Sequence, residues 1–74
     1  MTRFVSVNKD LSINVKNAVS VGTRIKHNGR SVDYWIDIEY KDKSKSILVG
    51  SCYDEKMVER QEYERQLTSF MNRL

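Results

Sequence analysis

The stretch His27-Asn28-Gly29-Arg30 decides the fold, because Asn-Gly supplies the two residues of positive φ that a type I′ hairpin turn requires. With Asn28 and Gly29 as a two-residue loop, the flanking segments become two long antiparallel strands that bury the same face. The residues that pair on that face are Ile25 with Val32, Thr23 with Tyr34, Val21 with Ile36, and Val19 with Ile38.

The opposite face of this hairpin carries two further pairs. Arg24 is expected opposite Asp33, which joins unlike charges across the strands. Gly22 is expected opposite Trp35, so that an aromatic ring covers a strand glycine. Trp35 therefore has two interpretations: a residue that shields Gly22, or an exposed anchor for a partner.

The same alternation extends in both directions along the chain. Downstream, a charged turn at residues 41–45 predicts a second hairpin that continues the apolar face. Upstream, residues 4–8 and 11–15 alternate as two short strands joined by Asn8-Lys9-Asp10. The expected pairs are Tyr40 with Ile47 and Ile38 with Val49 downstream, and Val7 with Leu11 and Val5 with Ile13 upstream.

Residues 55–74 have the composition of a helix, and a single apolar stripe runs along them. Extending that stripe backwards puts Arg60 and Lys56 on the buried line, while Val58 falls on the opposite side. Either the helix starts near Glu59 after a loop, or Asp54 caps an earlier start. The stripe consists of Tyr63, Leu67, Phe70, Met71 and Leu74.

These elements predict an α+β fold: a four- to five-stranded antiparallel meander with one C-terminal helix packed on one face. We expect a single domain over residues 1–74, because a chain of 74 residues supports one modest core and contains no proline or low-complexity linker. One cysteine and one histidine exclude an intrachain disulfide and a metal cage built from these residues alone. We expect no cofactor.

The net charge of +3 is unevenly distributed. Residues 1–54 contain nine basic and six acidic side chains, whereas residues 55–74 contain four of each. The excess positive charge therefore belongs to the strand-forming part of the chain. The alternating amino-terminal segment has no apolar run of the length that a signal peptide or membrane span needs, so a cytoplasmic location without membrane contact is expected.

A protein-binding surface is the leading candidate site. Trp35 is expected to face outward beside Leu48 and Cys52, giving an apolar centre with a charged rim. Val58, on the side of the helix away from the core, is a further candidate and favours a homodimer. The candidate protein-binding residues are Trp35, Leu48, Cys52 and Val58.

Catalytic and metal chemistry find little support in the sequence. Asp33, Asp37 and Glu39 share a strand face, but no loop wraps oxygen ligands around an ion. His27 and Cys52 are expected at opposite ends of the sheet, too far apart to act as base and nucleophile. We expect no enzymatic activity.

Two basic clusters support an alternative function in nucleic-acid binding. The clusters flank the two predicted turns, where loops are also charged simply to stay hydrated. They consist of Lys26 and Arg30 at one turn, and Lys41, Lys43 and Lys45 at the other.

The chain resembles small proteins of bacterial phages, prophages and mobile elements. The resemblance is carried by residues 4–8, 13–19, 35–38 and 47–51 and by the Tyr-Asp step at 53–54. It implies a meander with a closing helix and no catalytic residues. The segment around Met57 and Val58 departs from this pattern.

A weaker resemblance is to the transcriptional coactivator PC4 type of single-strand DNA-binding protein, a four-stranded meander that dimerises through its helix.

The leading hypothesis is a non-enzymatic interaction module that occupies a site on a host or defence protein. The alternative is a small PC4-like dimer that binds single-stranded nucleic acid.

Overall fold

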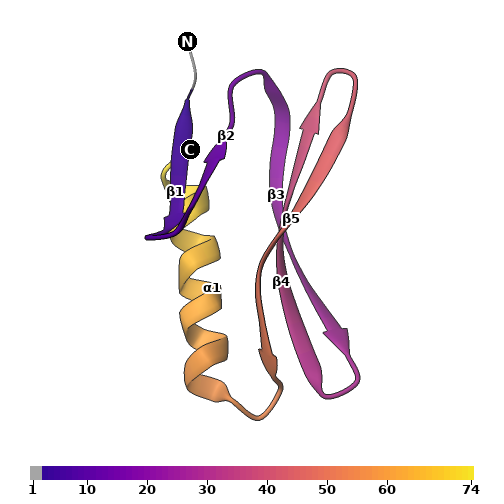
Figure 1. The fold of residues 1–74 in the computed structure, drawn as a ribbon, viewed down its shortest axis with the longest axis vertical. Coiled ribbons are helices and arrows are strands. Elements are labelled where there is room, and N and C mark those ends of the chain that lie inside the picture. Colours follow the sequence, from indigo (N-terminus) through magenta and orange to yellow (C-terminus); the bar gives the residue numbers. More distant parts are fainter. Residues whose placement is uncertain (1–2) are drawn as a thin grey trace.

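The computed structural model describes residues 3–74 as five antiparallel strands followed by one helix (Figure 1). The predicted α+β class and the C-terminal helix are therefore confirmed. The elements are β1 (Phe4–Asn8), β2 (Leu11–Asn14), β3 (Ala18–Asn28), β4 (Ser31–Tyr40), β5 (Ser44–Tyr53) and α1 (Met57–Asn72).

The strands form two sheets, so the prediction of one continuous meander is correct only in part. β1 pairs with β2 alone, and β3, β4 and β5 form a three-stranded sheet in that order. The chain turns between them at Asn17, which has a φ of 66°, and the Ala18 amide donates to the Val15 carbonyl at 3.1 Å. Asparagine tolerates this left-handed conformation better than most residues. The turn directs β3 away from the edge of β2.

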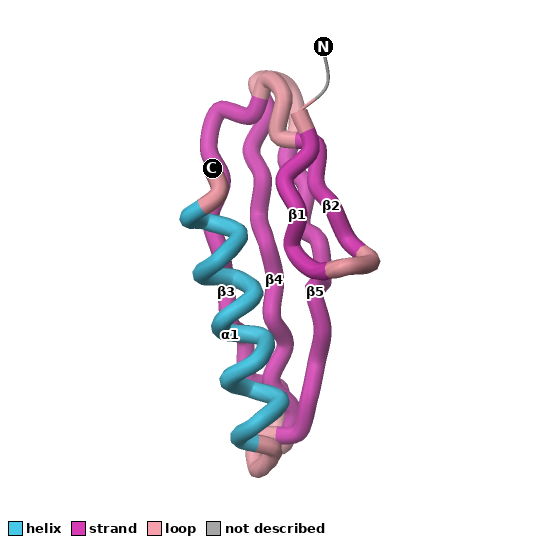
Figure 2. The backbone as a smooth tube through the Cα atoms, turned by 90° about the vertical axis from the view of Figure 1, so that its left-hand side faces the viewer, coloured by secondary structure: helices cyan, strands magenta, loops and turns pink. Residues whose placement is uncertain are grey.

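Both the β1–β2 hairpin and α1 pack on the same face of the three-stranded sheet (Figures 1 and 2). We call this the inner face and the opposite one the outer face. Because the β1–β2 hairpin stacks on the three-stranded sheet as a second layer, the apolar faces of both sheets are buried. If all five strands formed one flat sheet, the helix alone would have to cover its apolar face. The buried core consists of Val5, Val7, Ile13, Val15, Val32, Tyr34, Ile36, Ile38, Cys52, Leu67 and Phe70.

The β3–β4 hairpin has the predicted inner face but a register shifted by two residues. Its loop is Gly29-Arg30, and Asn28 lies opposite Ser31. Only Gly29 of the loop has a positive φ, at 60°, as the first central position of a type II′ turn requires. The predicted type I′ turn at Asn28-Gly29 is therefore wrong. A shift of two keeps every side chain on its predicted face.

The new register changes the partners across the hairpin. Arg24 lies opposite Trp35, and Gly22 lies opposite Asp37. The predicted Arg24–Asp33 and Gly22–Trp35 pairs are therefore wrong. The observed inner-face pairs are Ile25 with Tyr34, Thr23 with Ile36, and Val21 with Ile38.

The β4–β5 hairpin departs further from the prediction, because β5 contains an extra residue. Tyr34 pairs with Gly50 and Trp35 with Leu48, which leaves Val49 as a bulge. The alternation of side chains between the inner and outer faces is therefore reversed after the bulge. The predicted pairs Tyr40–Ile47 and Ile38–Val49 are replaced by Ile36–Ile47 and Ile38–Lys45.

The short β1–β2 hairpin is predicted correctly at its centre. Val5 pairs with Ile13 as expected. Near the turn, however, Leu11 pairs with Asn8, and the predicted Val7–Leu11 pair is absent because the register slips between Ser6 and Asn8.

The helix begins at Met57, two residues before the predicted Glu59 and without a cap from Asp54. Its N-cap residue is Lys56, which makes no side-chain capping bond. Asp54 instead pairs with Arg60, whose Nη1 lies 3.0 Å from Oδ1. Arg60 thus follows the buried line, as the stripe predicted. Leu67 and Phe70 are buried, whereas Met71 and Leu74 at the end of the stripe are exposed. Within residues 3–74, no helix is long and apolar enough to cross a membrane.

Candidate interaction surface

The outer face of β3–β4–β5 is left uncovered by the helix and by the β1–β2 hairpin (Figure 1). Across its middle runs a row of three side chains, one from each strand: Arg24, Trp35 and Leu48. The Arg24 guanidinium lies 5.1 Å from the centre of the Trp35 ring, a cation–π contact. Leu48 is 47% exposed. We call Arg24, Trp35 and Leu48 the outer-face row.

Trp35 and Leu48 thus share the face that the sequence predicted, but Trp35 does not lie across from Gly22. Trp35 is half-buried, and its indole Nε1 has no hydrogen-bond partner within residues 3–74. The Arg24 side chain covers one side of the Trp35 ring. The interpretation of Trp35 as a shield for Gly22 is therefore replaced by a stacked Arg24–Trp35 pair.

Two carboxylates of β4 on the outer face, Asp37 and Asp33, are engaged by their neighbours. Asp37 accepts hydrogen bonds from Arg24 Nε at 3.0 Å and from the Ser46 hydroxyl at 2.7 Å. These bonds, led by that from Arg24, hold the pKa of Asp37 below its usual value. Asp33 accepts from Asn28 at 2.7 Å and from Ser51 at 2.6 Å. The ion-paired Asp37 and the hydrogen-bonded Asp33 form the rim of the outer-face row.

Cys52 does not lie on the outer face. The bulge at Val49 reverses the phase of β5, so Cys52 pairs with Val32 and joins the core, with 8% of its surface exposed. The prediction of an outward Cys52 is therefore wrong. Burial raises the pKa of the Cys52 thiol.

The positions of His27 and Cys52 also differ from the prediction. Both pair with Val32, one from each side, so they lie in the same cross-strand row rather than at opposite ends of the sheet. Two strand spacings separate their backbones by about 9.6 Å. The fully buried Val32 lies between them. No base and nucleophile pair is formed by this arrangement.

The buried thiol gives a direct chemical prediction. We expect folded protein to react with iodoacetamide at pH 7.5 at least about tenfold more slowly than protein unfolded in urea, because the thiolate is both disfavoured and shielded. Mass spectrometry of timed, quenched samples measures both rates. Equal rates in the two states would show that Cys52 is accessible and reactive.

Val58 is separate from the outer-face row. It is 81% exposed on the first turn of α1, and its position on the helix is opposite Leu67. The four predicted protein-binding residues therefore occupy three places: Trp35 and Leu48 on the outer face, Cys52 in the core, and Val58 on the helix.

The five candidate nucleic-acid-binding residues also fall into separate groups. Arg30 lies in the β3–β4 turn and Lys26 just before it, whereas Lys41, Lys43 and Lys45 surround the β4–β5 turn. These turns lie at opposite ends of the sheet (Figure 1), along a molecule 41 Å long. Tyr34, predicted to face the core, is fully buried.

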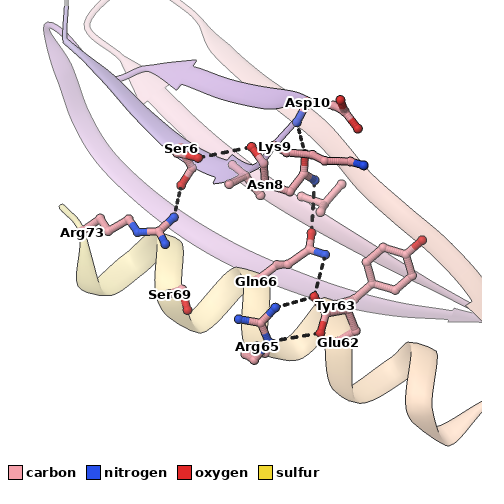
Figure 3. Close-up of a pocket in the computed structure, with 12 residues that line it drawn as sticks. Ser6, Asn8, Lys9, Asp10, Glu62, Tyr63, Arg65, Gln66, Ser69 and Arg73 are labelled. Atoms are coloured by element: carbon pink, nitrogen blue, oxygen red, sulfur yellow. Dashed lines mark hydrogen bonds and ion pairs between the residues drawn. The ribbon is translucent and has the colours of Figure 1, made fainter.

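A polar pocket between the β1–β2 turn and α1 was not anticipated from the sequence (Figure 3). Its groups bond mainly to one another: Asn8 Nδ2 donates to Gln66 at 3.2 Å, and Arg73 donates to the Ser6 carbonyl at 2.9 Å. The pocket therefore fastens the hairpin to the helix. These contacts join residues 58 and 67 positions apart, so they leave no local signal in the sequence.

Among residues 3–74, no group of three His, Cys, Asp or Glu side chains is arranged to hold a metal ion. Comparisons of the chain with models of protein families, with curated proteins and with solved structures find no match.

Proposed function

We propose that this chain is a non-enzymatic interaction module that binds a protein partner through the outer face of β3–β4–β5. One observation carries the proposal: a tryptophan and a half-exposed leucine lie at the centre of an open sheet face. Tryptophan and arginine are enriched among residues that dominate binding energy. Asp37, beside the row, is already ion-paired with Arg24, so covering this pair leaves neither of the two charges isolated.

The resemblance to small proteins of phages and mobile elements supports a particular kind of partner. We propose a host or defence protein, whose function this chain inhibits by occupying a site on it. The resemblance supports this kind of partner by analogy, and the outer face provides the surface that would bind it.

Replacement of Leu48 tests this proposal with little risk to the core. We expect Leu48→Asp to reduce capture of the partner from bacterial lysate by roughly tenfold or more, since loss of an interface anchor costs about 2 kcal/mol. Quantitative mass spectrometry of proteins retained by tagged wild-type and variant chains gives the ratio.

Val58→Asp is the matched control, because it places the same charge on an exposed aliphatic position of the helix. It should retain the partner as the wild type does, and thermal melting checks that both variants fold. Equal capture by wild type and Leu48→Asp, or repeated failure to retain any protein, would overturn the proposal.

The alternative, a PC4-like dimer that binds single-stranded nucleic acid, receives less support. Its five basic residues are divided between the two ends of the sheet, and the outer-face row between them offers one aromatic ring, already stacked on Arg24. Such proteins combine a continuous basic groove with several exposed aromatic rings. Fluorescence anisotropy with a labelled oligonucleotide at low salt decides the matter: tight, salt-dependent binding would restore this alternative.

A further inference from the structure

The free edge of β3 differs from that of β5. Both are outer strands of the three-stranded sheet, and within residues 3–74 neither pairs with a strand other than β4. The bulge at Val49 interrupts β5 near its middle. The irregularity in β3 lies at Val19, close to its start, and pairing continues without a break from Ser20 to Asn28. Bulges protect sheet edges from further pairing, so β3 offers the longer regular edge.

The hairpin loop fixes which backbone groups of β3 point outward. In a two-residue hairpin, the residues that flank the loop exchange both hydrogen bonds, and such pairs then alternate along the strands. Asn28 is therefore bonded to Ser31, and every second residue before it is bonded to β4 in the same way. The intervening residues direct their N–H and C=O groups towards the free edge: Val21, Thr23, Ile25 and His27.

The side chains beside this edge differ between the two faces of the sheet. On the outer face, Arg24 and Lys26 alternate along β3, which contains no acidic residue. No ion pair within residues 3–74 engages Lys26. A strand added at this edge would therefore meet positive charge on its outer face.

On the inner face, the edge borders an apolar groove beneath α1. The groove has a volume of ≈ 420 Å³. Ile25 of β3 is 46% exposed there, and Met71 of α1 is also exposed. The remaining groove residues are Thr23, Glu64, Leu67, Thr68 and Asn72.

We propose that the β3 edge receives an extended segment of the protein partner, which adds as a fourth strand with acidic side chains outward and apolar side chains inward. The backbone supplies the ladder, Lys26 selects the acidic residues, and the groove at Ile25 and Met71 accepts the apolar ones. This inference rests on the proposed function, because the added strand would extend the sheet next to Arg24 of the outer-face row.

The charge of β3 argues for a foreign segment rather than a second copy. Self-pairing of two β3 edges would bring two Lys26 side chains, neither of them ion-paired within residues 3–74, to the same pair of strands, with no acidic side chain on either strand. Like charges on paired strands are destabilising. An acidic segment gains from the same residues.

The first test uses a synthetic heptapeptide of alternating glutamate and valine, acetylated and amidated, with a lysine–valine peptide as its control. At saturation we expect amide exchange at Val21, Thr23, Ile25 and His27 to slow at least about tenfold, because these groups become hydrogen-bonded. Lys26→Glu should weaken peptide binding several-fold. Lys45→Glu on β5 changes the net charge equally and should leave binding unchanged.

The second test removes one edge donor. Thr23→Pro deletes an N–H that faces the free edge and leaves the ladder with β4 intact, which edge strands tolerate. It should abolish peptide binding, while Thr23→Val, which retains the donor, binds normally. Circular dichroism checks that both variants fold. If Thr23→Pro does not fold, the comparison of peptide binding by Lys26→Glu and Lys45→Glu tests the proposal instead.

Several results would overturn the edge proposal. Peptide-induced chemical shifts confined to β5, equal binding of the two peptides, or wild-type binding by Thr23→Pro would each contradict it. Protection of the four amides that rises with protein concentration in the absence of peptide would show that a second copy occupies the edge. Partner capture that is lost with Leu48→Asp but kept with Thr23→Pro would remove this inference alone. Peptide binding at β3 with unchanged capture by Leu48→Asp would instead remove only the outer-face function.

Discussion

Gly50→Ala is expected to lower the free energy of unfolding by about 3 kcal/mol, the upper range for overpacking a core. Gly50 lies opposite Tyr34, and the ring of Tyr63 from α1 rests directly on its backbone. An alanine Cβ would lie 2.5 Å from Tyr63 Cζ and 2.7 Å from its hydroxyl oxygen, well inside van der Waals contact. Tyr63 also stacks on Tyr34 at a centroid distance of 5.2 Å, so it cannot withdraw without losing that contact.

Gly22→Ala is the matched control for this substitution. Gly22 lies in the same sheet, on β3, but an added Cβ would meet no atom within 4 Å. We expect the free energy of unfolding to change by less than about 1 kcal/mol, in the stabilising direction, because alanine reduces the flexibility of the unfolded chain. Urea denaturation gives both values. Equal shifts for the two variants would show that the Tyr63 contact is not the cause.

A double-mutant cycle isolates the Gly50–Tyr63 contact. In the Tyr63→Ala background the ring is absent, so Gly50→Ala should cost about 2 kcal/mol less than in the wild type. An additive result would mean that the two residues do not interact.

Phe70→Ala is expected to cost about 3–5 kcal/mol, the usual loss on truncating a fully buried phenylalanine. Phe70 has 0% exposure and belongs to the core shared by α1, β4 and the β1–β2 hairpin. Natural domains are stable by only about 5–15 kcal/mol, and this chain is short. We therefore expect the variant to be partly unfolded near 37 °C, as measured by circular dichroism and urea titration.

Val58→Ala provides the comparison on the same helix. Val58 is highly exposed, and alanine has the better helix propensity. Its unfolding free energy should stay within about 0.5 kcal/mol of the wild type. A loss at Val58 comparable with that at Phe70 would indicate that a partner surface covers the helix in solution.

The sequence predicted which residues face inward more reliably than it predicted their partners. Because one face of the sheet is buried, the sequence determines which alternate residues of each strand point inward. An error of two residues in the β3–β4 register therefore still placed Tyr34, Ile36 and Ile38 in the core. The turn itself was ambiguous, because Gly29 can serve either as the second residue of an Asn-Gly turn or as the first residue of a Gly-Arg turn.

The bulge at Val49 explains most of the error in β5. Residues 47–49 are three consecutive apolar residues, Ile-Leu-Val, so the sequence does not show that one of them is an extra residue. Continuing a strict alternation through them predicts an outward Cys52. Tertiary packing decides the matter here: the bulge brings Gly50 under Tyr63 and Cys52 into the core. This information lies in the packing of the helix against β5, which the alternation within β5 does not encode.

The candidate surface was predictable in part for the same reason. Trp35 and Leu48 share a face in both registers, whereas the stacking of Arg24 on Trp35 depends on the observed register. The groove between Ile25 and Met71 needs the position of the helix. No periodicity in the sequence specifies that position, nor the packing of β1–β2 as a layer.

The position of α1 at the end of the chain has a kinetic consequence. The three-stranded sheet is joined by short turns and pairs only neighbours in sequence, whereas α1 fastens to β1 through Asn8–Gln66 and Ser6–Arg73. Contacts between distant residues form late, because closing a long loop costs entropy before it is rewarded. The part of the inner face that α1 covers therefore stays open until the helix has docked. In a chevron experiment, Phe70→Ala should accelerate unfolding more than it slows folding.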